Sequence, residues 1–217
     1  MSIAKKYIRR VKQNLALEAV WLPGHDIELG DILHRDDGIL VKIANISDYG
    51  IPFDTEVVQR NATLDFTAQG VRTRVIQGGV EVSPYNINMD VEATFEIEFN
   101  KEETYYIKTP QFDGIGISNL IRLGQQIAGI GSWKHRRWFV ATNVFSVTEF
   151  VFLGSSERDR TVEIRGEGSA IANYLETGFS TGLNFSGLQN IETKITGQSG
   201  AVTMRVNRFR KNGGIWK

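Results

Sequence analysis

The segment Asp90–Phe99, with the sequence DVEATFEIEF, carries the most regular pattern in the chain. Apolar and polar residues alternate along it without interruption, and successive side chains of a β-strand point to opposite faces. One face would carry Val91, Ala93, Phe95, Ile97 and Phe99, and the other Asp90, Glu92, Thr94, Glu96 and Glu98. Such alternation is typical of an antiparallel strand with one face on a core and the other in water. The sequence therefore predicts a fold built on antiparallel β-structure.

Strand-like segments on both sides of Asp90–Phe99 extend this pattern. The whole of Thr55–Phe99 is predicted to be β-structure, and Tyr105–Thr109 is expected to pair back on its last strand. Trp138–Leu153 is apolar on both faces and predicts one long strand. Further strands are expected at Leu15–Leu22, Ile27–Leu33, Ile39–Ile43, Thr161–Arg165 and Ala201–Phe209.

Helical segments are fewer and shorter. Ile3, Tyr7 and Val11 recur at helical spacing, and Ile117–Ala128 has an apolar stripe that ends at a glycine. A short helix is also expected at Ala170–Glu176. The sequence thus predicts an α+β fold: a large, twisted, mostly antiparallel sheet with an N-terminal basic helix and a few short helices, in a single domain of residues 1–217.

The composition is that of an ordinary soluble protein. Among 217 residues there are 25 Lys and Arg and 25 Asp and Glu, so the net charge is zero, whereas general nucleic-acid binders carry a positive excess. The absence of cysteine excludes disulfides, thiolate metal sites and cysteine nucleophiles. The apolar stretch Leu15–Leu22 is too short for a membrane-spanning helix and contains Glu18, and no signal-peptide cleavage site follows it. We expect the chain to be soluble and cytoplasmic as made.

Little in the sequence indicates catalysis. Gly178–Gly182 matches the G-x-S-x-G pattern around a nucleophilic serine, but that pattern requires a strand before Ser180, a helix after it and a later histidine. All three histidines precede it. Glu92, Glu96 and Glu98 share a strand face, yet nothing near them suggests the division of roles between carboxylates that acid–base catalysis requires. We predict no enzymatic activity, no metal and no cofactor, and a hydrolase that uses Ser180 is the weakest alternative.

Two clusters of cations beside aromatic or apolar residues indicate contact with an anionic membrane surface. In the N-terminal helix the cations are Lys5, Lys6, Arg9, Arg10 and Lys12, beside an apolar face as in interfacial helices. Lys134, Arg136 and Arg137 lie within Trp133–Trp138, and tryptophan with cations suits the headgroup layer. Trp21 is either a further lipid contact or a core residue. The alternatives are solvated basic surfaces and, less favoured, RNA binding.

Asp90–Phe99 also has the pattern of a strand that crosses a lipid bilayer, which takes about 9–11 residues, apolar toward lipid and polar toward a lumen. An open sheet cannot cross in this way, because its edges would leave unpaired N–H and C=O groups in hydrocarbon. Only a closed ring of many copies would pair those groups. Two interpretations therefore stay open: a half-buried strand of a soluble protein, or part of a hairpin that inserts when the protein oligomerises.

The order of these features resembles the pore-forming domain of gasdermins. The basic start at Tyr7–Lys12, the segment Leu15–Leu22 and the stretch LGDIL at Leu29–Leu33 are similar to that family's first helix and first two strands. The chain is most similar to the short fungal regulator-of-cell-death gasdermins, which lack an autoinhibitory C-terminal domain and act when incompatible allelic forms meet. The resemblance implies a non-enzymatic protein that binds an acidic phospholipid membrane, forms homo-oligomers or hetero-oligomers with an allelic partner, and permeabilises the plasma membrane. It implies no nucleic-acid partner.

Carried over to this chain, the resemblance implies roles for particular residues. The cations of the N-terminal helix would contact acidic phospholipids, and the turn Trp21–His25 would dip into the membrane. Thr55–Phe99 and about Val140–Ile195 would supply two inserting hairpins. The pore lumen would be lined by Asp90, Glu92, Glu96 and Glu98 and would favour cationic cargo. The alternative function is that of a soluble α+β module that binds protein or lipid and never inserts.

Overall fold

The computed structural model describes residues 2–216, apart from the side chains of residues 59–61, 113 and 190. Within this part of the chain the strands form sheets of seven, four and five strands, and every pairing whose register is described is antiparallel. The residues divide into two compact units, each assembled from segments far apart in the sequence. The predicted α+β class with mostly antiparallel strands is confirmed, although the strands are divided among three sheets. That the chain acts as a single domain stays a prediction.

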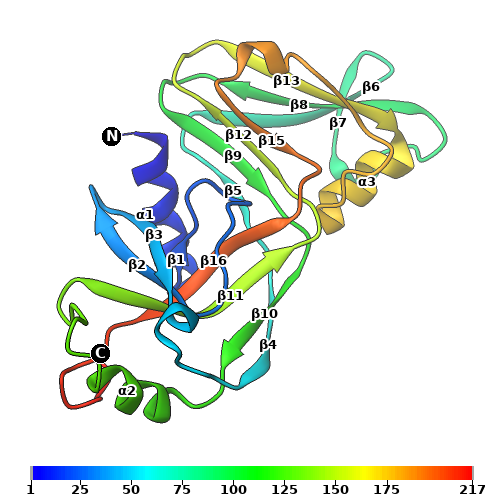
Figure 1. Cartoon of the computed structure of the whole chain (residues 1–217). Coiled ribbons are helices and arrows are strands. Elements are labelled where there is room, and N and C mark those ends of the chain that lie inside the picture. The colour runs from blue at the N-terminus through cyan, green and yellow to red at the C-terminus, as the bar shows by residue number, and fades with distance from the viewer. Residues whose placement is uncertain (1, 217) are drawn as a thin grey trace. The chain divides into compact units, whose positions relative to one another are not determined.

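The first unit comprises Ala62–Gln111 and Val147–Ser199 together with the first residues up to Ile3. One of its sheets has the strand order β14-β13-β8-β6-β7, and the other has the order β15-β12-β9-β5 (Figure 1). The strands of the first sheet are β6 (Val71–Gln77), β7 (Val80–Val82), β8 (Glu92–Phe99), β13 (Arg160–Glu167) and β14 (Asn184–Ser186). Those of the second are β5 (Asp65–Thr67), β9 (Thr104–Lys108), β12 (Val151–Ser155) and β15 (Thr193–Thr196). Helical elements of this unit are α3 (Gly168–Thr177) and the 3-10 turns η2 (Pro84–Asn86) and η3 (Leu188–Asn190).

Strand β8 organises the core of this unit. Ala93, Phe95, Ile97 and Phe99 are buried, and the residues between them are half-buried or exposed, as the alternation predicts. Strand β13 repeats the pattern, and α3 covers the same apolar side through Ile171 and Tyr174. Burial of each large side chain here contributes about 1.5–3 kcal/mol to folding. The sheet β14-β13-β8-β6-β7 therefore has one apolar side and one polar side.

The second unit comprises Ala4–Asn61, Phe112–Ser146 and Gly200–Lys217. Its sheet has the strand order β1-β16-β11-β10-β4, with β2 paired to β11 and β3 paired to β2 (Figure 1). The strands are β1 (Glu18–Ala19), β2 (Asp31–Asp36), β3 (Ile39–Asn45), β4 (Thr55–Ala62), β10 (Phe112–Ile117), β11 (Trp138–Val147) and β16 (Gly200–Asn207). The helical elements are α1 (Ile3–Leu15), α2 (Leu120–Ala128) and the 3-10 turn η1 (Ile46–Tyr49). Helix α2 buries Leu123 and Ile127 in a core that also contains Ile32, Val140 and Phe209.

The stretch Leu29–Leu33 forms the turn that starts β2. Gly30 has a left-handed backbone with φ of +84°, and a Cβ at this position would lie 2.9 Å from Cγ1 of Ile46, so that no larger residue fits without a shift. The carboxylate of Asp31 accepts hydrogen bonds from the backbone N–H of Glu28 at 2.8 Å and from Nδ2 of Asn45 at 2.9 Å. The glycine and the aspartate of this stretch thus have structural roles inside the second unit.

Several predicted β segments differ from the structure. Ile27–Leu33 is displaced, because β2 begins only at Asp31, and Thr55–Phe99 is not β throughout, because η2 and a turn at Asp90 interrupt it. Leu15–Leu22 is wrong as a strand, because α1 continues to Leu15 and only β1 is extended. Tyr105–Thr109 does form a strand, β9, but it pairs with β5 and β12 and not with β8. Trp138–Leu153 is two strands in different sheets, β11 and β12, separated by a bend. The part of this segment that forms β12 is apolar on both faces, because every residue of that strand is buried.

Candidate functional site

Helix α1 attaches to the second unit by its apolar face and carries its cations on the other faces. Ala4, Tyr7 and Val11 are buried, and the Tyr7 hydroxyl donates to the backbone carbonyl of Val202 on β16 at 3.4 Å. Lys5, Arg9, Arg10 and Lys12 are exposed, and Lys6 is half-buried. The predicted basic amphipathic helix is confirmed. Its role in lipid contact stays a prediction.

Lys5 and Lys12 of α1 form ion pairs within the protein. Nζ of Lys5 lies 2.8 Å from the carboxylate of Asp37. Nζ of Lys12 lies 2.7 Å from Glu18, whose other carboxylate oxygen is 3.3 Å from the guanidinium of Arg35. Burial raises the pKa of Glu18, but the hydrogen bonds and charges of Lys12 and Arg35 outweigh burial and lower that pKa. An ionised Glu18 therefore joins α1 to strand β2.

The second predicted cluster lines an open hollow of about 650 Å³, here called the basic hollow. The lining residues are His34, Arg35, Ile43, Lys134, Arg136, Arg137, Trp138 and Phe139, and none of these described residues is acidic. The ring of Trp138 packs edge-on against Trp133 with a centroid distance of 5.2 Å, and Nζ of Lys134 lies 5.6 Å from the Trp138 centroid. Trp133 is buried, so it supports the site and does not present itself to a membrane. Arg35 joins this hollow to Glu18 and thus to the α1 cations.

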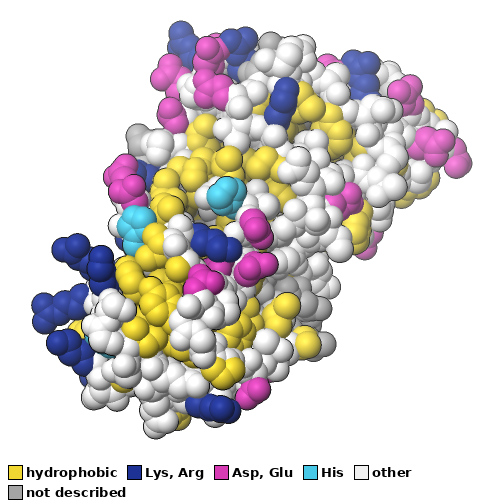
Figure 2. Space-filling model, viewed as in Figure 1, with side chains coloured by type: hydrophobic (Ala, Val, Ile, Leu, Met, Phe, Trp, Pro, Cys, Tyr) yellow, Lys and Arg dark blue, Asp and Glu magenta, His cyan; other side chains and the backbone are white. Residues whose placement is uncertain are grey.

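Arginines of the C-terminal segment extend the basic hollow, and the prediction from sequence did not include them. The guanidinium carbon of Arg208 lies 5.2 Å from the ring centroid of Phe139, and Arg208 donates to the backbone carbonyl of Arg136. Arg210 stacks on Trp216 at 4.8 Å. The signal for them was present, since the residues from Thr193 onward include basic side chains and no acidic one. Figure 2 shows dark-blue side chains gathered beside yellow ones near the C-terminal end of the chain.

The predicted lumen acids lie in the first unit, and only three of them are on the strand. Asp90 precedes β8 and is exposed in a turn, so the expected row of four carboxylates is reduced to Glu92, Glu96 and Glu98. The guanidinium of Arg74 on β6 lies 2.6 Å from Glu96 and 2.8 Å from Glu98. Glu96 and Glu98 are therefore held in ion pairs with Arg74 and are not free acids.

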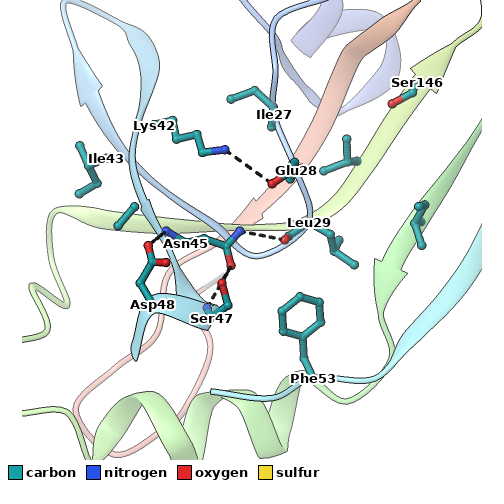
Figure 3. A pocket seen from close by; sticks show the side chains of 13 residues that line it. Ile27, Glu28, Leu29, Lys42, Ile43, Asn45, Ser47, Asp48, Phe53 and Ser146 are labelled. Carbon is teal, nitrogen blue, oxygen red and sulfur yellow. Dashed lines mark hydrogen bonds and ion pairs between the residues drawn. The ribbon is translucent and has the colours of Figure 1, made fainter. Parts of the chain in front are cut away.

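A larger hollow of about 840 Å³ lies beside the turn of Asp31 in the second unit (Figure 3). Its apolar lining residues include Phe53 and Ile115, and its polar lining residues, here called its rim, include Glu28, Lys42, Asn45 and Asp48. Asn45 donates to the carbonyl of Leu29 at 3.2 Å, and Lys42 lies 3.8 Å from Glu28 (Figure 3). Burial lowers the pKa of Lys42, but its hydrogen bond with Asp31 and the surrounding carboxylates outweigh burial and raise that pKa. The rim groups are engaged with one another, and we assign no ligand to this hollow.

Two solved gasdermin structures match the chain over nearly its whole length. One is a bacterial gasdermin from Bradyrhizobium tropiciagri, with 11% sequence identity over 97% of this chain and 89% of that one and a TM-score of 0.37. The other is the Gasdermin A3 membrane pore, with 9% identity over 96% of this chain and 89% of that one and a TM-score of 0.38. No family model and no curated protein matches the sequence. At this level of identity and TM-score, the two matches assign no role to any residue of this chain.

Ser180 has surroundings unlike those of a nucleophilic serine. A helix, α3, precedes it and an extended segment with β14 follows, which is the reverse of the strand–turn–helix that the motif requires. Its backbone N–H and its hydroxyl both donate to the carboxylate of Glu149, at 2.7 Å and 3.2 Å. Ser180 therefore holds the loop after α3 and is not set up as a nucleophile.

A membrane-spanning helix and a metal site are both absent from the described residues. Between residues 2 and 216 no helix is both long and apolar enough to span a membrane. Within the same part of the chain, no group of three or more His, Asp or Glu side chains has an arrangement that would hold a metal ion.

Proposed function

We propose that this protein is a gasdermin-like pore former that acts without enzymatic chemistry. It binds acidic phospholipids through α1 and the basic hollow, assembles with other copies, and inserts β-hairpins into the plasma membrane. The permeabilised cell then dies. The observation that carries the proposal is the two-sided sheet of the first unit, in which β8 alternates strictly between buried apolar residues and polar ones.

The apolar side of this sheet is suited to contact with lipid, and the polar side is suited to contact with water. Phe95, Ile97 and Phe99 are an apolar surface that can exchange contact with the core for contact with lipid chains. The glutamates of β8 would face a water-filled lumen, because each charge would cost several kcal/mol in hydrocarbon. The edges of the sheet would be paired only in a closed ring of copies, and insertion therefore requires oligomerisation.

The second unit supplies the means of recruitment. A cation near an anionic bilayer contributes about 1 kcal/mol, so the α1 cations and the basic hollow together bring a protein of zero net charge to acidic lipid. Because Lys5 is paired with Asp37 and Lys12 with Glu18, these two lysines contribute less to the free energy of lipid binding. We expect Arg9, which is exposed on α1, to contribute more.

Dye leakage from liposomes tests the proposed function. Wild-type protein is expected to release a trapped dye from vesicles that contain acidic phospholipid and not from neutral ones. The triple variant Lys6→Ala, Arg9→Ala and Arg10→Ala is expected to lose binding and leakage. Arg122→Ala, which removes an exposed cation from α2 outside both inserting segments, is the control. Absence of leakage from acidic vesicles, with and without an allelic partner protein, would exclude the proposed function.

Activation by an incompatible allelic form, as in the fungal gasdermins that the sequence resembles, is the finer part of the proposal. It predicts that leakage requires, or is strongly increased by, mixing two allelic proteins.

The second candidate is a soluble module that binds acidic lipid without insertion. The ion pairs that hold β6 to β8 favour it, since they stabilise the sheet as it is. This candidate predicts vesicle binding without leakage and no ring-shaped particles in electron micrographs.

A further inference from the structure

The polar side of the sheet β13-β8-β6 carries arginines in register with the glutamates. Directly opposite residues in an antiparallel pair place their side chains on the same face. Across β6 and β8, Arg72 is opposite Glu98 and Arg74 is opposite Glu96. Across β8 and β13, Arg165 is opposite Thr94, and Glu163 is opposite Glu96. The three arginines and the glutamates of these strands thus share one face.

Most charges on this face are paired. Arg74 bridges Glu96 and Glu98, Arg72 lies 2.9 Å from Glu81 on β7, and Arg165 pairs with Glu163 on its own strand. Glu96 and Glu163 would repel each other across the β8–β13 pair, and each has its own arginine. Arg74 is half-buried between its two partners, whereas Arg72 is exposed. Arg74 is therefore the arginine most firmly fixed to the glutamate row.

The pairing changes the charge that this face would present to a pore. The glutamates in these three strands are Glu92, Glu96, Glu98, Glu163 and Glu167. Together with Glu81 of β7, which lies on the same face opposite Ile76, they make six glutamates, and Arg72, Arg74 and Arg165 reduce the net charge from six negative units per copy to three. Rings of charged side chains decide which ions enter a pore, and every copy in a closed ring repeats the same charges. A single arginine per copy therefore has a large effect on the field in the lumen.

We propose that Arg74 is a determinant of ion and cargo selectivity, and that it makes the pore less cation-selective than its glutamates alone would. This inference rests on the proposed function. It assumes that β6 and β8 stay paired on insertion, which is supported by their seven consecutive register pairs from Val71↔Phe99 to Gln77↔Ala93. A pore lined by this face then favours the passage of cations without excluding anionic solutes.

Reversal potentials in planar bilayers under a KCl gradient test the inference. Arg74→Gln is expected to shift the reversal potential toward the potassium equilibrium potential, because it releases two glutamates in every copy. Glu98→Gln is expected to shift it in the opposite direction, and Arg74→Lys is expected to retain most of the wild-type value. Arg122→Gln, which removes the same charge from an exposed position on α2 outside both inserting segments, is the control and is expected to leave the potential unchanged.

The outcomes separate the two proposals. Pores with wild-type selectivity in Arg74→Gln, or an equal shift in Arg122→Gln, would overturn the role of Arg74 and leave pore formation intact. A wild-type protein that binds acidic vesicles and never conducts would overturn pore formation, and the selectivity role with it. If Arg74→Gln does not fold, as judged by circular dichroism, the comparison of Glu98→Gln with wild type and Arg122→Gln decides the question, since unchanged selectivity in Glu98→Gln would also overturn the proposal.

Discussion

The carboxylate of Asp31 lies 3.0 Å from Nζ of Lys42, and its side chain is completely removed from water. Lys42 remains about one-third exposed, so the pair has one buried and one partly solvated member. A buried charge is tolerated only when it is paired and hydrogen-bonded, and Asp31 satisfies this with Lys42, Asn45 and the backbone of Glu28. The turn at Leu29–Leu33 therefore depends on one carboxylate.

Replacement of Asp31 by Asn is expected to lower the free energy of unfolding by about 2–4 kcal/mol, because it leaves Lys42 without its buried partner and replaces a charge-assisted acceptor. Urea unfolding followed by circular dichroism measures the change. Asp36→Asn, at an exposed position on the same strand, is the matched control and should cost less than about 0.5 kcal/mol. Equal effects of the two substitutions would contradict the structural role of Asp31.

Gly30 and Gly38 allow backbone strain and side-chain collision to be measured separately. Both have φ near +85°, at +84° and +89°, but a Cβ would meet Ile46 and Phe53 at Gly30 and nothing within 4 Å at Gly38. We expect Gly38→Ala to cost about 1 kcal/mol from the left-handed backbone alone, and Gly30→Ala to cost about 1–3 kcal/mol more. Thermal unfolding of the two variants is the measurement. A larger loss for Gly38→Ala would show that this account of the turn is wrong.

The acid limb of the stability curve is expected to depend on Glu18. Its pKa is lower in the folded protein than its ordinary value of 4.5, so its contribution to stability is fully present above that value and is lost as the pH falls through the folded-state pKa. Between about pH 5 and pH 3, wild-type protein should therefore lose more stability than Glu18→Gln. Urea titrations at a series of pH values test this, with identical slopes in the two proteins as the contrary result.

Much of the fold followed from the sequence, and one of the exceptions, the division of Trp138–Leu153 into two strands, has a clear physical cause. Helix α1 and strand β8 are solvated on one side, so that their periodicity is visible in the residues. Strand β12 is buried on both sides, and such a strand has no polar face to mark its ends. For that reason the break between β11 and β12 could not be predicted.

The residues of the candidate site could be predicted from the sequence, but the contacts between them could not. The cations of α1 and of Lys134–Arg137 could be recognised as clusters, because each is local in sequence. That Arg208 stacks on Phe139, or that Arg74 bridges two glutamates of β8, depends on which strands are neighbours. The order of strands in a sheet cannot be deduced from sequence periodicity. For that reason the prediction was a row of free acids, whereas the structure has ion pairs.

Ser180→Ala tests the remaining enzymatic alternative. Because the Ser180 hydroxyl donates to Glu149 and no strand precedes it in the motif, we expect the substitution to leave vesicle leakage unchanged and to lower stability by about 1 kcal/mol. Glu149→Gln weakens two hydrogen bonds to Ser180 and is expected to cost at least as much. Loss of a measured esterase activity in Ser180→Ala, with stability intact, would revive the hydrolase.

The basic hollow is expected to bind acidic vesicles through charge, with its aromatic rings as support. Arg136→Ala combined with Arg137→Ala should lower the fraction of protein that sediments with vesicles containing acidic lipid, since both residues are exposed and line the hollow. Binding should also fall for wild type as salt rises, because the screening length shortens from about 10 Å at 0.1 M to about 3 Å at 1 M. Lys101→Ala combined with Arg122→Ala removes the same charge from exposed positions outside α1, the hollow and the inserting segments, and serves as the control. If the Arg136 and Arg137 variant binds as well as that control at low salt, the recruiting surface lies elsewhere, and α1 would have to supply it without the hollow.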